Sequence, residues 1–318
     1  MLLSAEAMHI PDGFLSFFVY MLTWIISILL VGYALRRVGR DLDERQLPMM
    51  GVLAAAIFAG QMLNFAIAGG TSGHLMGSAL AMILMGPWAA ILIMTSVVSI
   101  QALIFQDGGL LALGANIFNM GIVGVAVAYM VYQTIIKFSG KNKKGVLVAG
   151  FSAAWISVFI AALFVALELV VSGTSPARLA FPAMAGVHAL IGIGEGLITV
   201  GALTFMLSAR PDLILGEQTS RTGGRLVWLT GLILAVVLVI AAPLASSRPD
   251  GLEWVAMQTG FIDQAQASFY QIIPDYLLPG VANEALATIA AGLLGILIIA
   301  GVGLGVAYTR RKGKFFGS

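Results

Sequence analysis

Met8 and His9, just ahead of the first long apolar run, are the residues whose types and spacing best suit metal binding. If the mature chain began at Met8, its α-amine, the amide nitrogen of His9 and the His9 imidazole would reach one ion together. They would form fused chelate rings and fill three corners of a square, a planar nitrogen set that suits Ni²⁺, Cu²⁺ or Co²⁺. A lone histidine near a terminus is more commonly solvated, so this interpretation needs a fourth donor.

The chain has two other histidines, His74 and His188. His74 follows a glycine-rich turn at residues 69–73, where the backbone can approach another segment closely. Neutral imidazole is a common ligand for borderline divalent metals. On its own, a histidine there would cap the next helix or bond within the loop. Because the topology places it on the same side of the membrane as Met8 and His9, we predict that these three residues are the metal ligands.

Four further polar residues are placed to support such a site: Asn64, Asp107, Asn119 and His188. The Asn64 amide would orient the ligands or bond to a neighbouring helix. Asp107 would attract cations or cap the following helix, and the cap is favoured. His188 shares a helix face with Glu195, where the pair would relay charge, bind a partner helix or stabilise each other. Direct ligation by His188 is disfavoured, since four nitrogens are already supplied.

The seven residues that precede Met8, MLLSAEA, bear on whether its amine is free. They are too short for a complete signal peptide. However, Ala5-Glu6-Ala7 has the small-x-small form of a cleavage site, and cleavage there would expose Met8. Translation that begins at Met8 would give the same end, and a chance match is the third explanation.

The composition indicates a polytopic membrane protein within a lipid bilayer. Of 318 residues, 59% are apolar and 10% charged, whereas a soluble domain has about 25% charged residues. There is no cysteine, which excludes disulfides, thiolate metal sites and cysteine nucleophiles. The sequence has no HExxH, Walker A or Gly-x-Ser-x-Gly motif, so we predict a protein that is not an enzyme and has no nucleic-acid partner. An ATP-driven activity would require separate ATPase subunits.

A membrane-spanning helix needs about 20 mostly apolar residues, and nine candidate segments meet or approach this length. They are 14–35, 49–68, 75–86, 88–105, 110–136, 145–171, 184–208, 226–245 and 284–308. The third is too short to span alone, so residues 70–105 would alternatively form a broken or re-entrant helix pair.

The basic residues indicate the orientation of these spans. With the mature N-terminus outside and the C-terminus cytoplasmic, all but Arg178 and Arg248 of the 17 Lys and Arg residues fall on the cytoplasmic side. This distribution is a strong positive-inside signal. It places the Met8 end and the His74 loop together on the outer side.

The fold predicted is all-α, with a seven-helix unit followed by a two-helix C-terminal module. The expected divisions are a leader remnant or wrongly assigned start at 1–7, the seven-span unit at 8–208, a cytoplasmic linker at 209–225, a two-span module at 226–308 with an outer loop at 246–283, and a basic cytoplasmic tail at 309–318.

Four motifs in order resemble the CbiM/NikM family, the substrate-binding S components of energy-coupling-factor transporters for cobalt and nickel. They are MHIPDGFLS (8–16), GGTSGHLMG (69–77), FQDGGLLALGAN (105–116) and HALIGIGEG (188–196). In addition, RPDGLE at 248–253 is similar to the PDGLE module of the accessory CbiN/NikN subunit. The chain therefore resembles a fused protein of both parts.

The resemblance implies planar metal binding by the terminal amine and by the second residue's amide and imidazole, here Met8 and His9, together with one loop histidine, here His74. It also implies ATPase subunits and a transmembrane coupling subunit as partners, in the cell (inner) membrane. The extension before Met8 departs from the family, because an attached leader converts the amine into an amide. We expect nickel to be favoured over cobalt, which would serve cobalamin synthesis, and no resident cofactor. The alternative is an ion-coupled carrier that works without ATPases, with Glu168, Glu195 and His188 as a proton path.

Overall fold

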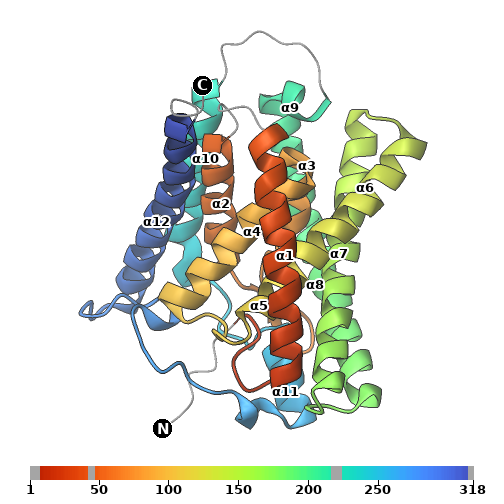
Figure 1. Ribbon diagram of the computed structural model, residues 1–318, viewed down its shortest axis with the longest axis vertical. Helices are drawn as coiled ribbons and strands as arrows, with labels where there is room; N and C mark the ends of the chain where they lie inside the picture. Colours follow the sequence, from red (N-terminus) through yellow and green to blue (C-terminus); the bar gives the residue numbers. More distant parts are fainter. Residues whose placement is uncertain (1–7, 42–46, 216–223, 314–318) are drawn as a thin grey trace.

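The computed structural model describes residues 8–41, 47–215 and 224–313, so the predicted leader at 1–7 and parts of the predicted linker and tail lie outside it. Most of the described residues are helical (Figure 1). The helices are α1 Phe17–Asp41, α2 Leu47–Gln61, α3 Ser78–Met85, α4 Pro87–Ile100, α5 Leu113–Asn116, α6 Gly124–Ser139, α7 Lys143–Val171, α8 Ala177–Ala209, α9 Pro211–Leu215, α10 Gly224–Ala241, α11 Gly251–Thr259 and α12 Glu284–Gly313.

Short irregular elements join several of these helices. The π-helical turns Gln101–Phe105 and Ile117–Val123 extend α4 and connect α5 to α6. Three 3₁₀ turns lie in the C-terminal part, at Ala242–Leu244, Ile262–Gln264 and Pro274–Tyr276.

Among the residues that the structure describes, six helical segments are long and apolar enough to cross a membrane, which confirms the prediction of an all-α, multi-pass membrane protein. They are Phe17–Val38, Pro87–Phe105, Leu113–Ser139, Lys143–Val171, Ala177–Ala209 and Glu284–Val302. Two shorter apolar helices, Pro48–Gln61 and Leu229–Leu244, accompany them.

The third predicted span does not exist as a spanning helix. At about 1.5 Å per residue, the eight residues of α3 cover less than half of a hydrocarbon core about 30 Å thick. Gly86 ends α3 at φ 78°, and Pro87 begins α4 immediately afterwards. The broken helix pair that we considered for 70–105 is therefore closer to the observed arrangement.

The predicted span 49–68 is wrong at its C-terminal end. Helix α2 stops at Gln61, and residues 65–73 form a small antiparallel hairpin of β1 Phe65–Ala66 and β2 Ser72–Gly73. Non-helical backbone at membrane depth is tolerated only where protein surrounds it. Accordingly, Thr71, Ser72 and Gly73 are buried, and the Ser72 amide donates to the Pro249 carbonyl at 2.8 Å.

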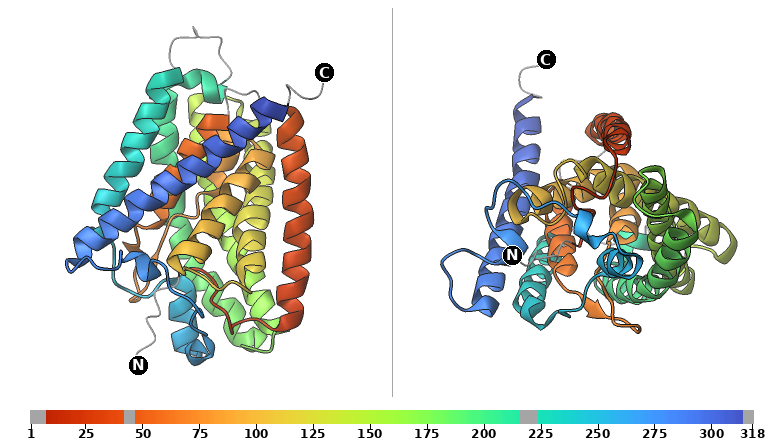
Figure 2. Two further views of the ribbon diagram at one scale, coloured as in Figure 1. Left: turned by 60° about the vertical axis from the view of Figure 1, so that its left-hand side comes forward. Right: turned by 90° about the horizontal axis from the view of Figure 1, so that it is seen from below.

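The C-terminal part of the chain packs against the rest of the bundle. Helices α10 and α12 lie against α2, α11 lies against α8, and α7 packs between α6 and α8. Figure 2 shows that α12 runs obliquely to the other helices of the bundle. The glycines of α8 at 192 and 196 permit two close approaches to α7. A Cβ at Gly192 would lie 2.8 Å from the Trp155 ring, and one at Gly196 would lie 2.6 Å from the Phe151 ring.

The loops divide between the two ends of the bundle. The C-terminal ends of α1, α8 and α12 and the α6–α7 turn lie at the upper end in Figure 1. These are segments in which the sequence concentrates Lys and Arg. The N-terminal segment before α1, the α4–α5 loop and α11 lie at the lower end, where the candidate site is found.

Candidate metal site

The N-terminal segment folds back across the lower end of the bundle and is held there by Asn116. The Asn116 side-chain oxygen accepts from the Ile10 amide at 3.0 Å, and its nitrogen donates to the Ile10 carbonyl at 3.1 Å. The Gly109 amide also donates to that carbonyl, at 2.9 Å. These bonds fix the backbone next to His9. Asn116 was not among the supporting residues that we predicted.

Asp107 contacts both predicted ligands at the chain's N-terminal end. Its Oδ1 accepts from the Met8 backbone nitrogen at 2.8 Å and lies 2.9 Å from His9 Nδ1. Its Oδ2 accepts from the Tyr276 hydroxyl at 2.6 Å. Burial pushes the pKa of Asp107 upward, but His9, Tyr276 and His74 outweigh it, so the pKa lies below its ordinary value.

The helix-cap role that we favoured for Asp107 is wrong. Asp12 provides the carboxylate oxygens that accept from the Leu110 and Ala112 amides, at 3.1 and 3.0 Å, just before α5. Asp12 reaches them because the N-terminal segment lies across this loop. Asp107 is thereby left to face Met8 and His9.

His74 lies on the opposite side of the site, immediately after β2. Its Nδ1 is 3.4 Å from Asp250 Oδ2, and its ring centroid is 5.5 Å from that of His9. Burial lowers the pKa of His74, but the hydrogen bond and charge of Asp250 outweigh it and the pKa is raised. The two imidazoles that we predicted as ligands therefore face each other, each beside a carboxylate.

Glu195 on α8 fixes the backbone that follows His74. Its two carboxylate oxygens accept from the Met76 and Gly77 amides, at 2.6 and 2.8 Å. Gly77 has φ 81°, a conformation that favours glycine. Binding to these backbone amides was not among the roles that we considered for Glu195, because the amides lie far from it in the sequence.

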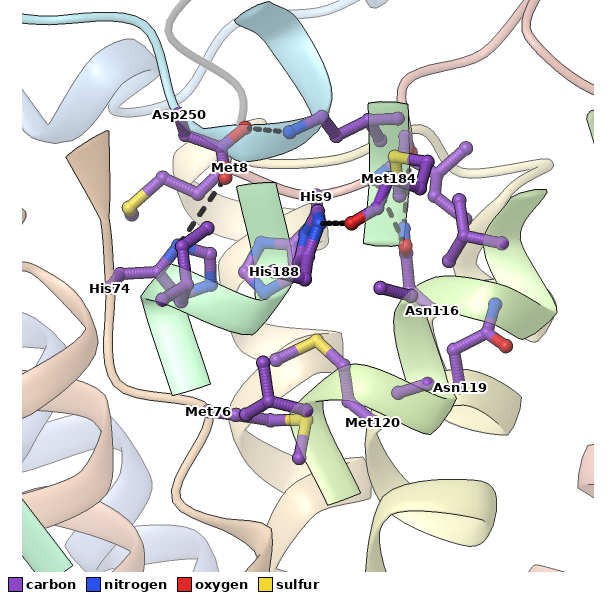
Figure 3. A pocket seen from close by; sticks show the side chains of 17 residues that line it. Met8, His9, His74, Met76, Asn116, Asn119, Met120, Met184, His188 and Asp250 are labelled. Carbon is purple, nitrogen blue, oxygen red and sulfur yellow. Dashed lines mark hydrogen bonds and ion pairs between the residues drawn. The ribbon is translucent and has the colours of Figure 1, made fainter. Parts of the chain in front are cut away.

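A cavity of about 100 Å³ lies between these elements (Figure 3). All three histidines of the chain line it, together with Asp250 and the thioethers of Met8, Met76, Met120 and Met184. His188 donates from Nδ1 to the Met184 carbonyl at 2.9 Å. The His9 side chain is 1% exposed, and its Nε2 has no hydrogen-bond partner among the residues that the structure describes.

Asn119 and Asn64, the other two predicted supporting residues, line different cavities. Asn119 lines this cavity and donates to Glu168 Oε2 at 2.8 Å, a buried contact between two polar residues at membrane depth. Asn64 is not in the histidine cavity. It lines a larger neighbouring cavity, and its carbonyl accepts from the Ser246 amide at 2.8 Å.

The C-terminal part of the chain contributes two residues that we did not predict as part of the site, Asp250 and Tyr276. The hydroxyl of Tyr276 reaches Asp107, and the carboxylate of Asp250 reaches His74. Asp250 lies in the PDGLE-like motif at 248–253, which the sequence shows, but the motif alone did not indicate a contact with His74. Tyr276 lies in an irregular segment without any pattern that would single it out.

These features define a class of protein: a helical, multi-pass membrane protein whose N-terminal segment and internal loop enclose a histidine-lined cavity. Residues 9–213 match the family described as the cobalt uptake substrate-specific transmembrane region, and residues 225–312 match the PDGLE domain. The chain belongs to this cobalt uptake family and carries a PDGLE domain after it, which confirms the resemblance to a fused CbiM/NikM–PDGLE protein.

Relatives cover either the whole chain or its first part. A protein from Archaeoglobus fulgidus whose name includes NikMN is 41% identical over 95% of this chain and 98% of its own length. The fused nickel transport protein NikMN of Rhodobacter capsulatus is 32% identical over 96% of this chain and 100% of its own length. The cobalt transport protein CbiM of Sorangium cellulosum is 33% identical over 65% of this chain and 94% of its own length. A crystal structure of a transition metal transporter has 31% identity and a TM-score of 0.57, and the match covers 63% of this chain and 92% of that one.

Proposed function

We propose that this chain is the substrate-binding membrane component of an ATP-driven energy-coupling-factor importer for divalent transition metal ions, with Ni²⁺ preferred to Co²⁺. The observation that carries the proposal is the convergence of Met8, His9 and His74 on one buried cavity. The metal is the transported substrate, and the chain holds it only in passage.

The geometry around Asp107 supports chelation by the N-terminal end. The Met8 nitrogen and His9 Nδ1 lie 2.8 and 2.9 Å from the same Asp107 oxygen, so both donors point toward one position. With a free Met8 amine, a divalent ion would take the place of the protons that now face Asp107 Oδ1 and would bind both nitrogens, with the His9 amide nitrogen between them. His74, across the cavity, is the fourth donor.

Nitrogen donors in a plane favour Ni²⁺ over Co²⁺, because affinity rises from Co²⁺ to Ni²⁺ and because Ni²⁺ accepts tetragonal geometry readily. The names of the fused relatives, which refer to nickel, support the same preference. The orientation proposed has the Met8 end outside and the basic ends of the bundle in the cytoplasm, in line with the positive-inside distribution.

Energy for transport would come from separate ATPase subunits and a transmembrane coupling subunit. The buried carboxylates support this view over an ion-coupled carrier, because Glu195 holds backbone amides and Glu168 accepts from Asn119. A proton path would require these groups to exchange protons during each cycle. Uptake that persists in cells without ATPase partners would favour the carrier.

The test measures ⁶³Ni uptake, and Ni²⁺ binding by the purified protein, for His9→Ala and His74→Ala at matched protein levels. Gln271→Ala, in the exposed outer segment, is the control. We expect both histidine variants to lose binding and uptake, and the control to retain them. Unchanged uptake in either histidine variant would overturn the proposal, as would N-terminal sequencing that finds residues 1–7 intact on active protein.

A further inference from the structure

A second cavity lies beside the histidine cavity and is built largely from the C-terminal part of the chain. Its volume is about 770 Å³. Its lining comes mainly from the α10–α11 connection, the 3₁₀ turn near Tyr276 and the start of α12. Met8 and Asp250 line both cavities. These two residues therefore stand at the boundary between the large cavity and the site.

Asp250 is held rigidly at this boundary. Its Oδ1 caps α11 by accepting from the Leu252 and Glu253 amides, at 3.0 and 3.1 Å. Its Oδ2 is directed instead to His74 Nδ1, at 3.4 Å. The preceding carbonyl of Pro249 accepts from the Ser72 amide, so the backbone of residue 249 is tied to the strand that leads to His74.

Gly251 allows this close fit between α11 and α8. A Cβ on Gly251 would lie 2.6 Å from Ile191 Cδ1 and 3.1 Å from His188 Cε1. The first turn of α11 can therefore sit directly over the histidine cavity, which places the capping carboxylate of Asp250 at its edge.

The larger cavity has a strong excess of acidic residues. Four carboxylates line it, and one guanidinium opposes them: Asp250, Glu253, Asp275, Glu284 and Arg248. A cleft lined mainly by one sign of charge and walled by low-dielectric protein raises the local concentration of counter-ions. A divalent cation would therefore accumulate next to Asp250.

We propose that Asp250 is a relay ligand, which receives the divalent cation from the larger cavity and passes it to His74 and the N-terminal chelate. This inference deepens the proposed function and rests on it. Carboxylate and water oxygens are weaker ligands for Ni²⁺ or Co²⁺ than a set of nitrogens, so transfer from Asp250 to the imidazole site is favourable. Met8, which also faces both cavities, lies on the same route.

The test compares Asp250→Asn with the wild type, using the full-length protein with a free Met8 amine. Asparagine caps a helix as well as aspartate does, so α11 is retained while the charge is lost. Asp263→Asn is the control, because Asp263 is an exposed carboxylate in the same outer segment and lines neither cavity. Equal elution profiles and circular dichroism establish that the variants are folded.

The measurement is stopped-flow loading of Ni²⁺ over a series of salt concentrations, with equilibrium binding determined alongside. Electrostatic steering changes association rates by about 10-fold or more. We expect Asp250→Asn to slow loading by about 10-fold and to flatten its dependence on salt, while it still binds Ni²⁺ at equilibrium and Asp263→Asn behaves as wild type.

Two outcomes would overturn the relay. Loading by Asp250→Asn at the wild-type rate with the wild-type salt dependence would show that the carboxylate is not on the route. Loss of equilibrium binding as complete as in His74→Ala would make Asp250 a permanent part of the site. Neither outcome affects the proposed function, which would instead fail if the wild type itself bound no Ni²⁺.

Discussion

The hydroxyl of Tyr276 is predicted to control the metal affinity of a site that it does not touch. It donates to Asp107 Oδ2 at 2.6 Å, and the other oxygen of that carboxylate contacts Met8 and His9. Tyr276→Phe removes this hydrogen bond and leaves the ring in place, stacked on Phe105 with centroids 4.7 Å apart. Asp107 then loses the partner that fixes its orientation.

The size of the effect follows from the burial of this pair. Asp107 and Tyr276 are both buried, and a hydrogen bond to a charged group contributes about 1.5–3 kcal/mol. Mutation of groups that orient metal ligands lowers affinity by about 10- to 100-fold, which is about 1.4–2.8 kcal/mol at 1.4 kcal/mol per decade. We therefore expect Ni²⁺ affinity to fall by about 10- to 100-fold in Tyr276→Phe.

The assay is a competition titration of Ni²⁺ against a chelator with the purified protein. Tyr270→Phe is the matched control, because its hydroxyl donates to the Leu103 carbonyl at 2.8 Å in the neighbouring segment and does not reach Asp107. Wild-type affinity in Tyr276→Phe would refute the argument that Asp107 orients the chelate. An equal loss in Tyr270→Phe would show that the segment between α11 and α12 as a whole, rather than the Asp107 contact, is responsible.

Three further predictions concern the elements around the cavity. In the wild type, two backbone amides donate to the two carboxylate oxygens of Glu195, and Glu195→Gln leaves them only one side-chain acceptor. We therefore expect the free energy of unfolding to fall by about 1.5–3 kcal/mol, seen as lower thermal stability and weaker Ni²⁺ binding. Asn116→Ala removes both side-chain bonds to Ile10, and we expect faster hydrogen exchange at residues 8–12 by mass spectrometry with exchange at α7 unchanged. Acid releases the metal, because protons compete for imidazole. Since Asp250 raises the pKa of His74, Asp250→Asn should move the midpoint of release to lower pH in a pH titration of bound Ni²⁺, and a midpoint that rises or stays fixed would contradict this assignment.

The membrane-spanning helices, and the placement of Met8 and His74 at the same end of the bundle, were predictable from the sequence, because apolar runs and basic flanks are local signals. The end of α2 was not. Residues 65–68, Phe-Ala-Ile-Ala, continue the apolar run and so extend the predicted span. The chain leaves the helix at Gln61 instead, and the hairpin that follows bonds to Pro249, a contact far away in sequence.

Contacts between residues far apart in the sequence also determine which residues surround the predicted ligands. Asp107 and Met8 are 99 positions apart, Asn116 and Ile10 are 106 apart, and Tyr276 and Asp107 are 169 apart. A single sequence carries no signal for such pairs, since each depends on how the helices pack. Residue types alone indicated candidate ligands, whereas the groups that hold them required the fold.

The Pro-Asp-Gly triplet, which occurs at 11–13 and again at 249–251, performs a similar task twice. Each aspartate accepts from two backbone amides: Asp12 from Leu110 and Ala112, in the turn before α5, and Asp250 from Leu252 and Glu253, in the first turn of α11. Each glycine then permits a close approach that a side chain would block, because a Cβ on Gly13 would collide with the Gln264 carbonyl and one on Gly251 with Ile191.

The two triplets also join the N-terminal segment to the C-terminal part of the chain. Gln264 lies in the segment after α11, and the neighbouring Gln266 amide donates to the Asp12 carbonyl at 2.8 Å. The segment that carries Met8 and His9 is thus covered by the segment after α11, while Asp250 reaches His74 from the same part of the chain. A change in how the PDGLE part sits on the bundle would therefore be felt by both halves of the proposed metal site at once, which gives a physical reason for carrying both parts on one chain.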